Sequence, residues 1–340
     1  MNKHEGKILL SHGNGGRMMH DLIENLFLKH FENTIINEQY DSAILPAHAD
    51  EIAFTTDSFV IDPLFFPGGN IGKLAVCGTV NDLAVSGAVP QYISVSFILE
   101  EGFSMLELEE IVKSMAKEAR YAQVAVVTGD TKVVNKGKCD KLFINTSGIG
   151  RVGKKDQLVG KAQKINPGDV IIINGTIGDH GMAVMSARES FNFKTQVVSD
   201  CASLNHLIRN ILDQSPGVKF MRDPTRGGVA TVLNELSVKI NRGIEISEQE
   251  LPVSKGVRAM CEILGFEPLH IANEGKALVV STVDESESIL RIMKDHPLGR
   301  NSAIIGTVVN DHPGKVVLKT VTGGRRIIDS LTGDPLPRIC

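Results

Sequence analysis

The sequence predicts an α/β protein of two domains that ends in an extended tail. Strand-like runs alternate with helix-like runs along the chain, an alternation typical of α/β folds. A stretch rich in Lys and Gly at 150–168 separates two such series. The length of the chain, 340 residues, also favours about two domains. We expect a Gly-rich segment with a helix over 1–40, a first domain over 41–152, a second domain over 168–330 and a tail over 331–340.

Four elements of the first domain follow from the spacing of apolar residues. Every second residue of 92–99 is apolar on one side, from Ile93 to Leu99, which predicts a strand. Apolar residues recur at helical spacing along 106–122, and acidic residues occupy the first turn, where the helix dipole favours them. The short apolar runs at 124–128 and 142–146 predict two further strands.

The second domain shows the same two kinds of run. Residues 228–240 and 254–264 predict helices, and four apolar runs predict strands, at 170–174, 277–281, 303–309 and 316–321. The loop at 310–314 contains Asp, Pro and Gly, so we expect the last two strands to form a hairpin.

Composition excludes several classes of protein. The chain is 42% hydrophobic and 22% charged with a net charge of −4, so no basic surface for nucleic acid or anionic membrane is predicted. No apolar run approaches the roughly 20 residues of a membrane span, and the N-terminus does not read as a signal peptide. The cysteines are odd in number and widely spaced, which favours free thiols in the cytoplasm. They are Cys77, Cys139, Cys201, Cys261 and Cys340.

The last residue, Cys340, carries a thiol that a mobile tail could bring into an active site or present to another protein. Pro335 and Pro337 restrict φ and favour an extended approach, and Gly333-Asp334 before them reads as a turn. The plain alternative is a frayed terminus that happens to end in Cys.

A glycine-rich loop lies near the N-terminus. Gly13, Asn14, Gly15 and Gly16 precede Arg17, and such a loop lets backbone N–H groups approach an anion. The Gly-Lys-Ser/Thr ending of a Walker A loop is missing. A flexible loop with no ligand remains the alternative.

The first domain also contains carboxylates that lie beside short polar residues and apolar runs, at expected strand ends. Mg²⁺ uses a few carboxylates together with substrate phosphates, so this set indicates a nucleotide and metal site. Taken singly, each Asp is as well explained as a cap or turn residue. The set is Asp50, Asp57, Asp82 and Asp130, with Lys73 and Lys132 nearby in sequence.

Two motifs of the second domain could carry chemistry. Gly227-Gly228 opens a predicted helix, and Arg222 and Arg226 precede the two glycines. This arrangement is either an anion site or an ordinary helix start. Glu274 lies in a loop directly before a strand, where it could act as a general base or form a surface turn.

These motifs together resemble the HypE family of hydrogenase maturation proteins. The resemblance covers Pro67 to Ala84, Thr128 to Val134, Arg222 to Gly228, Asn273 to Gly275 and the terminal Pro-Arg-Ile-Cys. The internal motifs alone are similar to the wider aminoimidazole ribonucleotide synthetase (PurM)-like superfamily of ATP-using enzymes. The terminal motif is the more specific one.

The resemblance implies a fold, a reaction and partners. The fold is a PurM-like pair of domains, in which the N-terminal sheet pairs across a homodimer and the C-terminal domain is α+β. The reaction is ATP-dependent dehydration of a carbamoyl group on Cys340 to a thiocyanate, whose cyanide becomes a ligand of the iron in [NiFe]-hydrogenase. The implied partners are the carbamoyltransferase HypF, which loads Cys340, and a HypC–HypD complex, which accepts the cyanide.

It also implies roles for individual residues. Cys340 is the covalent carrier, Glu274 the base that deprotonates the carbamoyl nitrogen, and Lys132 a group that orients the carbamoyl or offsets charge. The metal ligands are drawn from Asp50, Asp57, Asp82 and Asp130, which would hold Mg²⁺. The residues assigned to ATP are Gly13, Asn14, Gly15, Gly16, Asp57, Lys73, Asn81, Asp82, Asp130 and Asp223.

Two rival functions remain open at this point. One is a small-molecule kinase of the same superfamily, such as a thiamine-phosphate kinase or a selenophosphate synthetase, although the latter is expected to carry Cys or selenocysteine in its N-terminal loop, and 11–17 contains neither. The other is a non-enzymatic scaffold that uses Cys340 as a redox or docking handle. The kinase would keep its activity without Cys340, and the scaffold would never turn over ATP.

Overall fold

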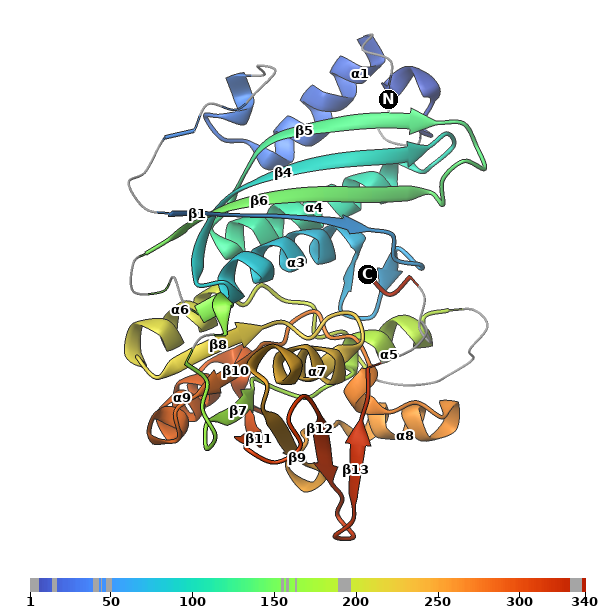
Figure 1. Cartoon of the computed structure of the whole chain (residues 1–340). Coiled ribbons are helices and arrows are strands. Elements are labelled where there is room, and N and C mark those ends of the chain that lie inside the picture. The colour runs from blue at the N-terminus through green and yellow to red at the C-terminus, as the bar shows by residue number, and fades with distance from the viewer. Residues whose placement is uncertain are drawn as a thin grey trace.

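The computed structural model consists of two α/β domains, each built on its own sheet and stacked on the other (Figure 1). The predicted α/β class and the division into two domains are therefore confirmed. The structure describes residues 6–13, 17–38, 43, 45–46, 51–153, 156, 159–162, 164–188, 197–330 and 338–340.

The first domain contains a four-stranded sheet in the order β1-β6-β4-β5. Strands β4 and β5 are parallel and the other neighbours are antiparallel. The parallel pair needs a crossover, and α4 (Met105–Ala122) supplies it. The strands are β1 (Glu51–Phe59), β4 (Ala88–Glu100), β5 (Ala125–Val134) and β6 (Leu142–Val152).

Helices cover one face of this sheet and leave the other open. The covering helices are α3 (Ile71–Val85), α4 and the N-terminal run α1 (Arg17–Leu22), η2 (Ile23–Leu28) and α2 (Lys29–Phe31). The predicted apolar stripe of α4 is fully buried, and Phe27 of η2 stacks on Phe97 of β4 with ring centroids 5.0 Å apart. On the opposite face, Ile52 and Phe54 of β1 are 66% and 67% exposed.

The second domain contains a seven-stranded sheet in the order β13-β12-β9-β11-β7-β10-β8. Helix α7 packs on one face, whereas α6 and α9 pack on the other, so β7 and β10 are buried on both sides. The strands are β7 (Val170–Ile173), β8 (Val218–Arg222), β9 (Gly243–Ser247), β10 (Leu278–Ser281), β11 (Ala303–Val309), β12 (Val316–Lys319) and β13 (Arg325–Ile328). The helices are α5 (Asp179–Ser186), α6 (Asn205–Gln214), α7 (Gly228–Ile240), α8 (Lys255–Leu264) and α9 (Val283–Asp295).

The predicted hairpin between β11 and β12 is wrong. Strand β9 lies between them, antiparallel to β11 and parallel to β12. The loop after β11 crosses over β9, where a Cβ on Gly243 would lie 1.9 Å from the carbonyl oxygen of Asp311. A glycine at 243 therefore permits the crossing, a long-range feature that the loop's own residues do not reveal.

The prediction that the carboxylates lie at strand ends is also wrong for three of them. Asp57 lies inside β1 and Asp130 inside β5, while Asp82 lies on α3. Helix α3 is buried on nearly all sides because it is enclosed between the first sheet and the second domain. Its sequence therefore lacks the polar stripe that normally reveals a helix.

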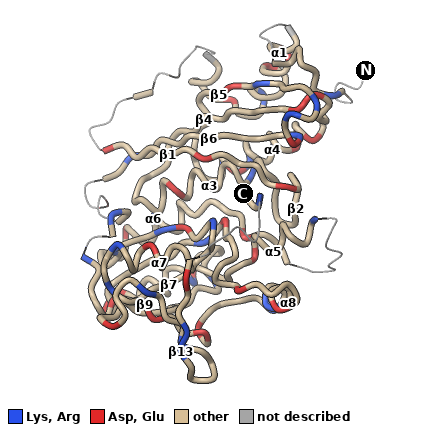
Figure 2. The backbone as a smooth tube through the Cα atoms, turned by 45° about the vertical axis from the view of Figure 1, so that its right-hand side comes forward, with Lys and Arg blue, Asp and Glu red and all other residues tan. Residues whose placement is uncertain are grey.

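The two domains meet at α3 and at the tail. The Asn81 amide on α3 donates to the carbonyl of Ala202 at 3.0 Å and accepts from the backbone N–H of Leu204 at 2.8 Å. Figure 2 shows the C-terminus between the domains, beside α3 and close to β2 (Phe65–Phe66). None of the described helices is both long and apolar enough to cross a membrane.

Candidate active site

A cavity of about 420 Å³ lies where the two domains meet. Strand β1 and helix α3 form its wall from the first domain, and the start of α7 and the loop before β10 form its wall from the second. It brings together six residues that the sequence singled out, from five distant segments. They are Asp57, Asp82, Asp223, Arg226, Glu274 and Cys340.

The end of the tail is docked in this cavity, where its backbone lies alongside the residues that directly follow β1. The backbone N–H groups of Val60 and Asp62 donate to the carbonyls of Cys340 and Arg338, both at 3.2 Å. The Arg338 side chain returns a bond from Nε to the Val60 carbonyl at 2.9 Å, and its guanidinium pairs with Asp140. Ile339 is buried in a hydrophobic cluster to which both domains contribute. The structure therefore shows an inward position of the tail, and the described Arg338–Cys340 segment is held at each residue.

Arg226 faces the thiol of Cys340. Its Nε lies 3.3 Å from Sγ, and the residue precedes Gly227 and Gly228, both of which have positive φ at the start of α7. A Cβ on Gly228 would lie 2.6 Å from two backbone carbonyl oxygens, so this tight turn requires glycine. The sequence identified Arg226 only as one of two charges beside a possible anion site, whereas the structure places it on the thiol.

Glu274 is the buried carboxyl of the cavity. Its Oε1 has no hydrogen-bond partner in the part of the chain that the structure describes. Burial raises the pKa of Glu274 well above its usual value, and the neighbouring Cys340 thiol raises this pKa further. A carboxyl held in this way beside a reacting group is suited to accept or donate a proton.

The loop that carries Glu274 is fixed on both sides. Asn273 accepts the N–H of Gly178 at 2.8 Å and donates to the Pro224 carbonyl at 3.0 Å. The Asp200 carboxylate accepts the backbone N–H groups of Glu274 and Gly275 at 3.3 and 3.1 Å. Lys276 pairs with the same Asp200 at 3.1 Å, and both side chains are buried. The base candidate therefore sits on a rigid loop.

Three carboxyls form the acidic side of the cavity. Burial and the charge of Asp82 raise the pKa of Asp57 to about 6, and the same two causes raise that of Asp223 to about 7. The pKa of Asp82 is also raised by burial, although Thr55 donates to its carboxyl at 2.7 Å. Carboxylates that repel each other favour a bound cation between them. Among the described residues, no group of three His, Cys, Asp or Glu side chains has the geometry of a metal site.

Asp130 and Lys132 are not part of this cavity. They lie on β5, at the opposite edge of the sheet from β1. Three strand spacings separate β5 from β1, which amounts to about 14 Å. Side chains on a strand point alternately to the two faces of the sheet. The register pairs Asp130 with Ser96, and Ser96 with Asn145, on the open face. Asp57 lies on the other face, toward α3. Their carboxylate and ammonium form an ion pair at 3.0 Å. One chain therefore cannot join Asp57 and Asp130 through one metal ion.

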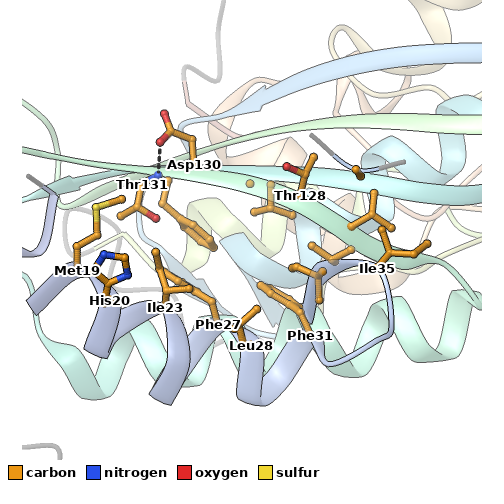
Figure 3. A pocket seen from close by; sticks show the side chains of 17 residues that line it. Met19, His20, Ile23, Phe27, Leu28, Phe31, Ile35, Thr128, Asp130 and Thr131 are labelled. Carbon is orange, nitrogen blue, oxygen red and sulfur yellow. Dashed lines mark hydrogen bonds between the residues drawn. The ribbon is translucent and has the colours of Figure 1, made fainter. Parts of the chain in front are cut away.

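A second cavity of about 280 Å³ lies beneath β5, between the strand and the N-terminal helices (Figure 3). Its lining is mostly apolar, with Ile23, Phe27 and Phe31 on one side and Thr131 on the other. Asp130 points away from these side chains, and its carboxyl accepts the backbone N–H of Thr131 at 2.8 Å. A mostly apolar cavity with a few polar groups next to Asp130 is suited to a flat aromatic ring such as a purine.

The remaining predicted residues divide into three groups. Gly13 packs against β5, where a Cβ would lie 2.6 Å from the backbone nitrogen of Val133. Lys73 lies in the first turn of α3 and donates to the Gly68 carbonyl at 3.2 Å, and Asn81 bridges the domains rather than lining the cavity. Asn14, Gly15, Gly16 and Asp50 lie outside the described residues.

Sequence reasoning missed several residues around the tail. His180 is fully buried and lies 2.8 Å from the Ile339 carbonyl through Nε2, and Arg188 donates from Nη2 to the Arg338 carbonyl at 3.1 Å. Asp200 holds the Glu274 loop. These residues do not form a spaced motif, so only the position of the tail reveals them.

Comparison with known proteins identifies the family of the chain. Models of the AIR synthase related protein match the chain at residues 39–152 for the N-terminal domain and 166–319 for the C-terminal domain. The carbamoyl dehydratase HypE of Escherichia coli strain K12 is 49% identical over 338 residues, which cover 98% of this chain and 99% of that protein. A solved structure of a HypE in complex with ATP has a TM-score of 0.93 at 44% identity and covers 98% of this chain and 99% of that one. A HypE in a HypE–HypF complex has a TM-score of 0.79 at 49% identity and covers 91% of this chain and 99% of that one.

Proposed function

Since the chain belongs to the HypE family of AIR synthase related proteins, we propose that it is the ATP-dependent carbamoyl dehydratase of [NiFe]-hydrogenase maturation. It converts an S-carbamoyl group on Cys340 into a thiocyanate. The observation that carries the proposal is the docked tail, which places the Cys340 thiol in one cavity with Arg226 and the buried carboxyl of Glu274. This placement also disfavours a small-molecule kinase, because a kinase of a diffusible substrate has no need of a thiol there.

The reaction balances with ATP as the co-substrate. The γ-phosphoryl group passes to the carbamoyl oxygen, ADP leaves, two protons leave the nitrogen, and the C–O bond breaks as phosphate departs and C≡N forms. Glu274 accepts a proton from the nitrogen in its carboxylate form, and burial, which raises its pKa, makes this carboxylate a stronger base. Arg226 stabilises negative charge near the sulfur.

The acidic wall fits the metal that accompanies ATP. Asp57 and Asp82 are the two carboxylates best placed to hold Mg²⁺, with Asp223 beside them, because their mutual repulsion is relieved by a cation. Held by these carboxylates, Mg²⁺ would supply positive charge to offset that of the phosphoryl group. Gly13 to Gly16 and Lys73 remain phosphate candidates, and the apolar cavity beneath β5 is our candidate site for the adenine.

The separation of Asp130 and Lys132 from the cavity favours a homodimer. The open face of the first sheet exposes Ile52 and Phe54, a pair of apolar side chains that a second copy would cover. If the β1 edge of one copy lies beside the β5 edge of the other, the strand that carries Asp130 and Lys132 in the second copy comes next to the strand that carries Asp57 in the first. We propose that Lys132 of that copy acts on the carbamoyl group from there.

Loading and delivery require the tail to leave the cavity. Cys340 in its inward position is partly enclosed, whereas HypF must reach the thiol to carbamoylate it and the HypC–HypD complex must reach the thiocyanate to accept cyanide. We therefore propose that the tail alternates between the docked position and an exposed one in the cytoplasm.

Intact mass spectrometry tests the proposal. The chain is incubated with a HypF protein, carbamoyl phosphate and ATP, and fresh Mg–ATP is then added, with Cys340→Ala as the control. The proposal expects a carbamoyl-sized gain on the natural chain alone, followed by loss of the mass of one water. Absence of an adduct, together with equal ATP hydrolysis by Cys340→Ala, would overturn it in favour of a kinase.

A further inference from the structure

We propose that His180 is a positioning residue that fixes the docked tail, and that Ser199 and Asp200 link this contact to the placement of Glu274. The inference rests on the proposed dehydratase function and goes beyond it, because it identifies what holds the inward state. The link consists of two adjacent residues: Ser199 contacts His180, and Asp200 contacts the loop that carries Glu274.

The first step is the contact with the tail. His180 lies in the first turn of α5 and is fully buried. Its Nε2 lies 2.8 Å from the Ile339 carbonyl, which belongs to the peptide group that leads directly into Cys340. Fixing this carbonyl fixes the plane of that peptide, and hence the direction in which the Cys340 side chain leaves the backbone.

The second step is the tautomer of the imidazole. The Ser199 hydroxyl oxygen accepts the backbone N–H of Cys201 at 3.1 Å and lies 2.8 Å from His180 Nδ1. The hydroxyl hydrogen is therefore available to donate to Nδ1, which leaves the ring proton on Nε2, facing the Ile339 carbonyl. Burial lowers the pKa of His180, which favours the neutral ring that this arrangement needs.

The third step is the connection to the base. Asp200 follows Ser199 directly, and its carboxylate accepts the backbone N–H groups of Glu274 and Gly275. The two backbones are in close contact, because a Cβ on Gly275 would lie 1.8 Å from the Asp200 carbonyl oxygen. Ser199 is itself anchored to the first domain through its N–H to the Pro67 carbonyl at 2.8 Å. The position of the tail and the position of Glu274 thus depend on one rigid segment.

Two substitutions of His180 separate the contact from mere packing. Gln carries an amide N–H at about the reach of Nε2, so His180→Gln keeps a donor to the Ile339 carbonyl. Asn is shorter and places its amide near Nδ1, so His180→Asn loses that donor while remaining polar. The measurement is the rate at which N-ethylmaleimide alkylates Cys340 in the full-length protein, followed by peptide mass spectrometry, with melting temperatures recorded for each variant.

We expect His180→Asn to be alkylated at Cys340 about three- to tenfold faster than the natural chain, the range for loss of one hydrogen bond, and His180→Gln to lie close to the natural rate. In single-turnover dehydration of the preloaded chain, His180→Asn should slow the step without changing the ATP concentration that half-saturates it. Equal alkylation rates in all three proteins overturn the inference, and so do equal effects of Asn and Gln.

Ser199→Ala tests the link itself. Without the hydroxyl, the imidazole proton is no longer confined to Nε2, so we expect faster alkylation than in the natural chain and slower dehydration. An unchanged dehydration rate overturns the link. If even the natural loaded chain fails to lose water, the proposed function fails, whereas the alkylation comparison still decides whether His180 holds the tail.

Discussion

The two parts of the predicted site differ in how completely one chain builds them. At the domain interface, Cys340, Arg226 and Glu274 share one cavity, in which backbone hydrogen bonds hold Cys340 and the Glu274 loop, and Arg226 contacts the thiol. On β5, Asp130 and Lys132 lie on the open face at the far edge of the sheet, where each is about half-exposed or more. One chain therefore assembles the proposed carrier and base, and the contrast is the reason for our proposal that a second copy completes the nucleotide side.

The largest effect should come from the base. We expect Glu274→Gln to lower the rate of dehydration by about 10²- to 10⁴-fold, since a neutral amide cannot accept the nitrogen proton. Carbamoylation of Cys340 by HypF should be unchanged, because the substitution keeps the shape of the cavity. Intact mass after incubation with HypF measures carbamoylation, and intact mass after addition of Mg–ATP measures dehydration. Glu235→Gln is the matched control, because Glu235 lines the same cavity but forms an exposed ion pair with Arg222. A similar loss in both variants would contradict a special role for Glu274.

The next effect concerns the open face of the first sheet. We expect Phe54→Lys to convert a dimer into a monomer and to abolish dehydration, because a charge at this position opposes burial of the face. Sedimentation velocity and the mass assay measure the two outcomes. Val238→Lys is the control, since Val238 on α7 has the same exposed fraction of 67% and lies outside that face. A Phe54→Lys protein that remains dimeric and active would exclude this interface.

A smaller effect is a change of the free energy of unfolding with pH that the buried carboxyl of Glu274 causes. Its pKa in the folded protein is raised well above the usual 4.5, so the folded state keeps a proton that the unfolded chain releases. The free energy of unfolding therefore falls as pH rises from about 4.5 toward the raised pKa, by up to about 1.4 kcal/mol per pH unit for this one group. We expect Glu274→Gln to lack this component, so that its stability relative to the natural chain increases with pH. Urea unfolding between pH 5 and pH 8 measures the difference, and parallel curves would contradict a buried neutral Glu274.

Much of the architecture could be predicted from local patterns. Strand 92–99 and helices 106–122 and 228–240 have strong periodicity, and all three lie where the spacing placed them. Helix α3 could not be read from periodicity because it is buried on almost every side. The pairing of β11 and β12 around β9 depends on a long-range crossing, which local loop residues do not specify.

The site shows the same division. Glu274 and Cys340 were predicted from motif and resemblance, and the structure brings them into one cavity. The face on which Asp130 lies depends on strand register, which a run of sequence does not give. His180 and Asp200 act through backbone groups of distant residues, so nothing near them in sequence marks them.

A heterodimer made from two inactive variants tests the central claim most directly. Glu274→Gln and Lys132→Ala chains, each with a different affinity tag, are co-expressed, and the mixed dimer is purified and assayed for dehydration. If each site combines Glu274 of one chain with Lys132 of the other, one of the two sites is intact and we expect about half of the natural activity. If the mixed dimer is as inactive as the parent variants, both groups act within one chain, and the account of a site shared between two copies is contradicted.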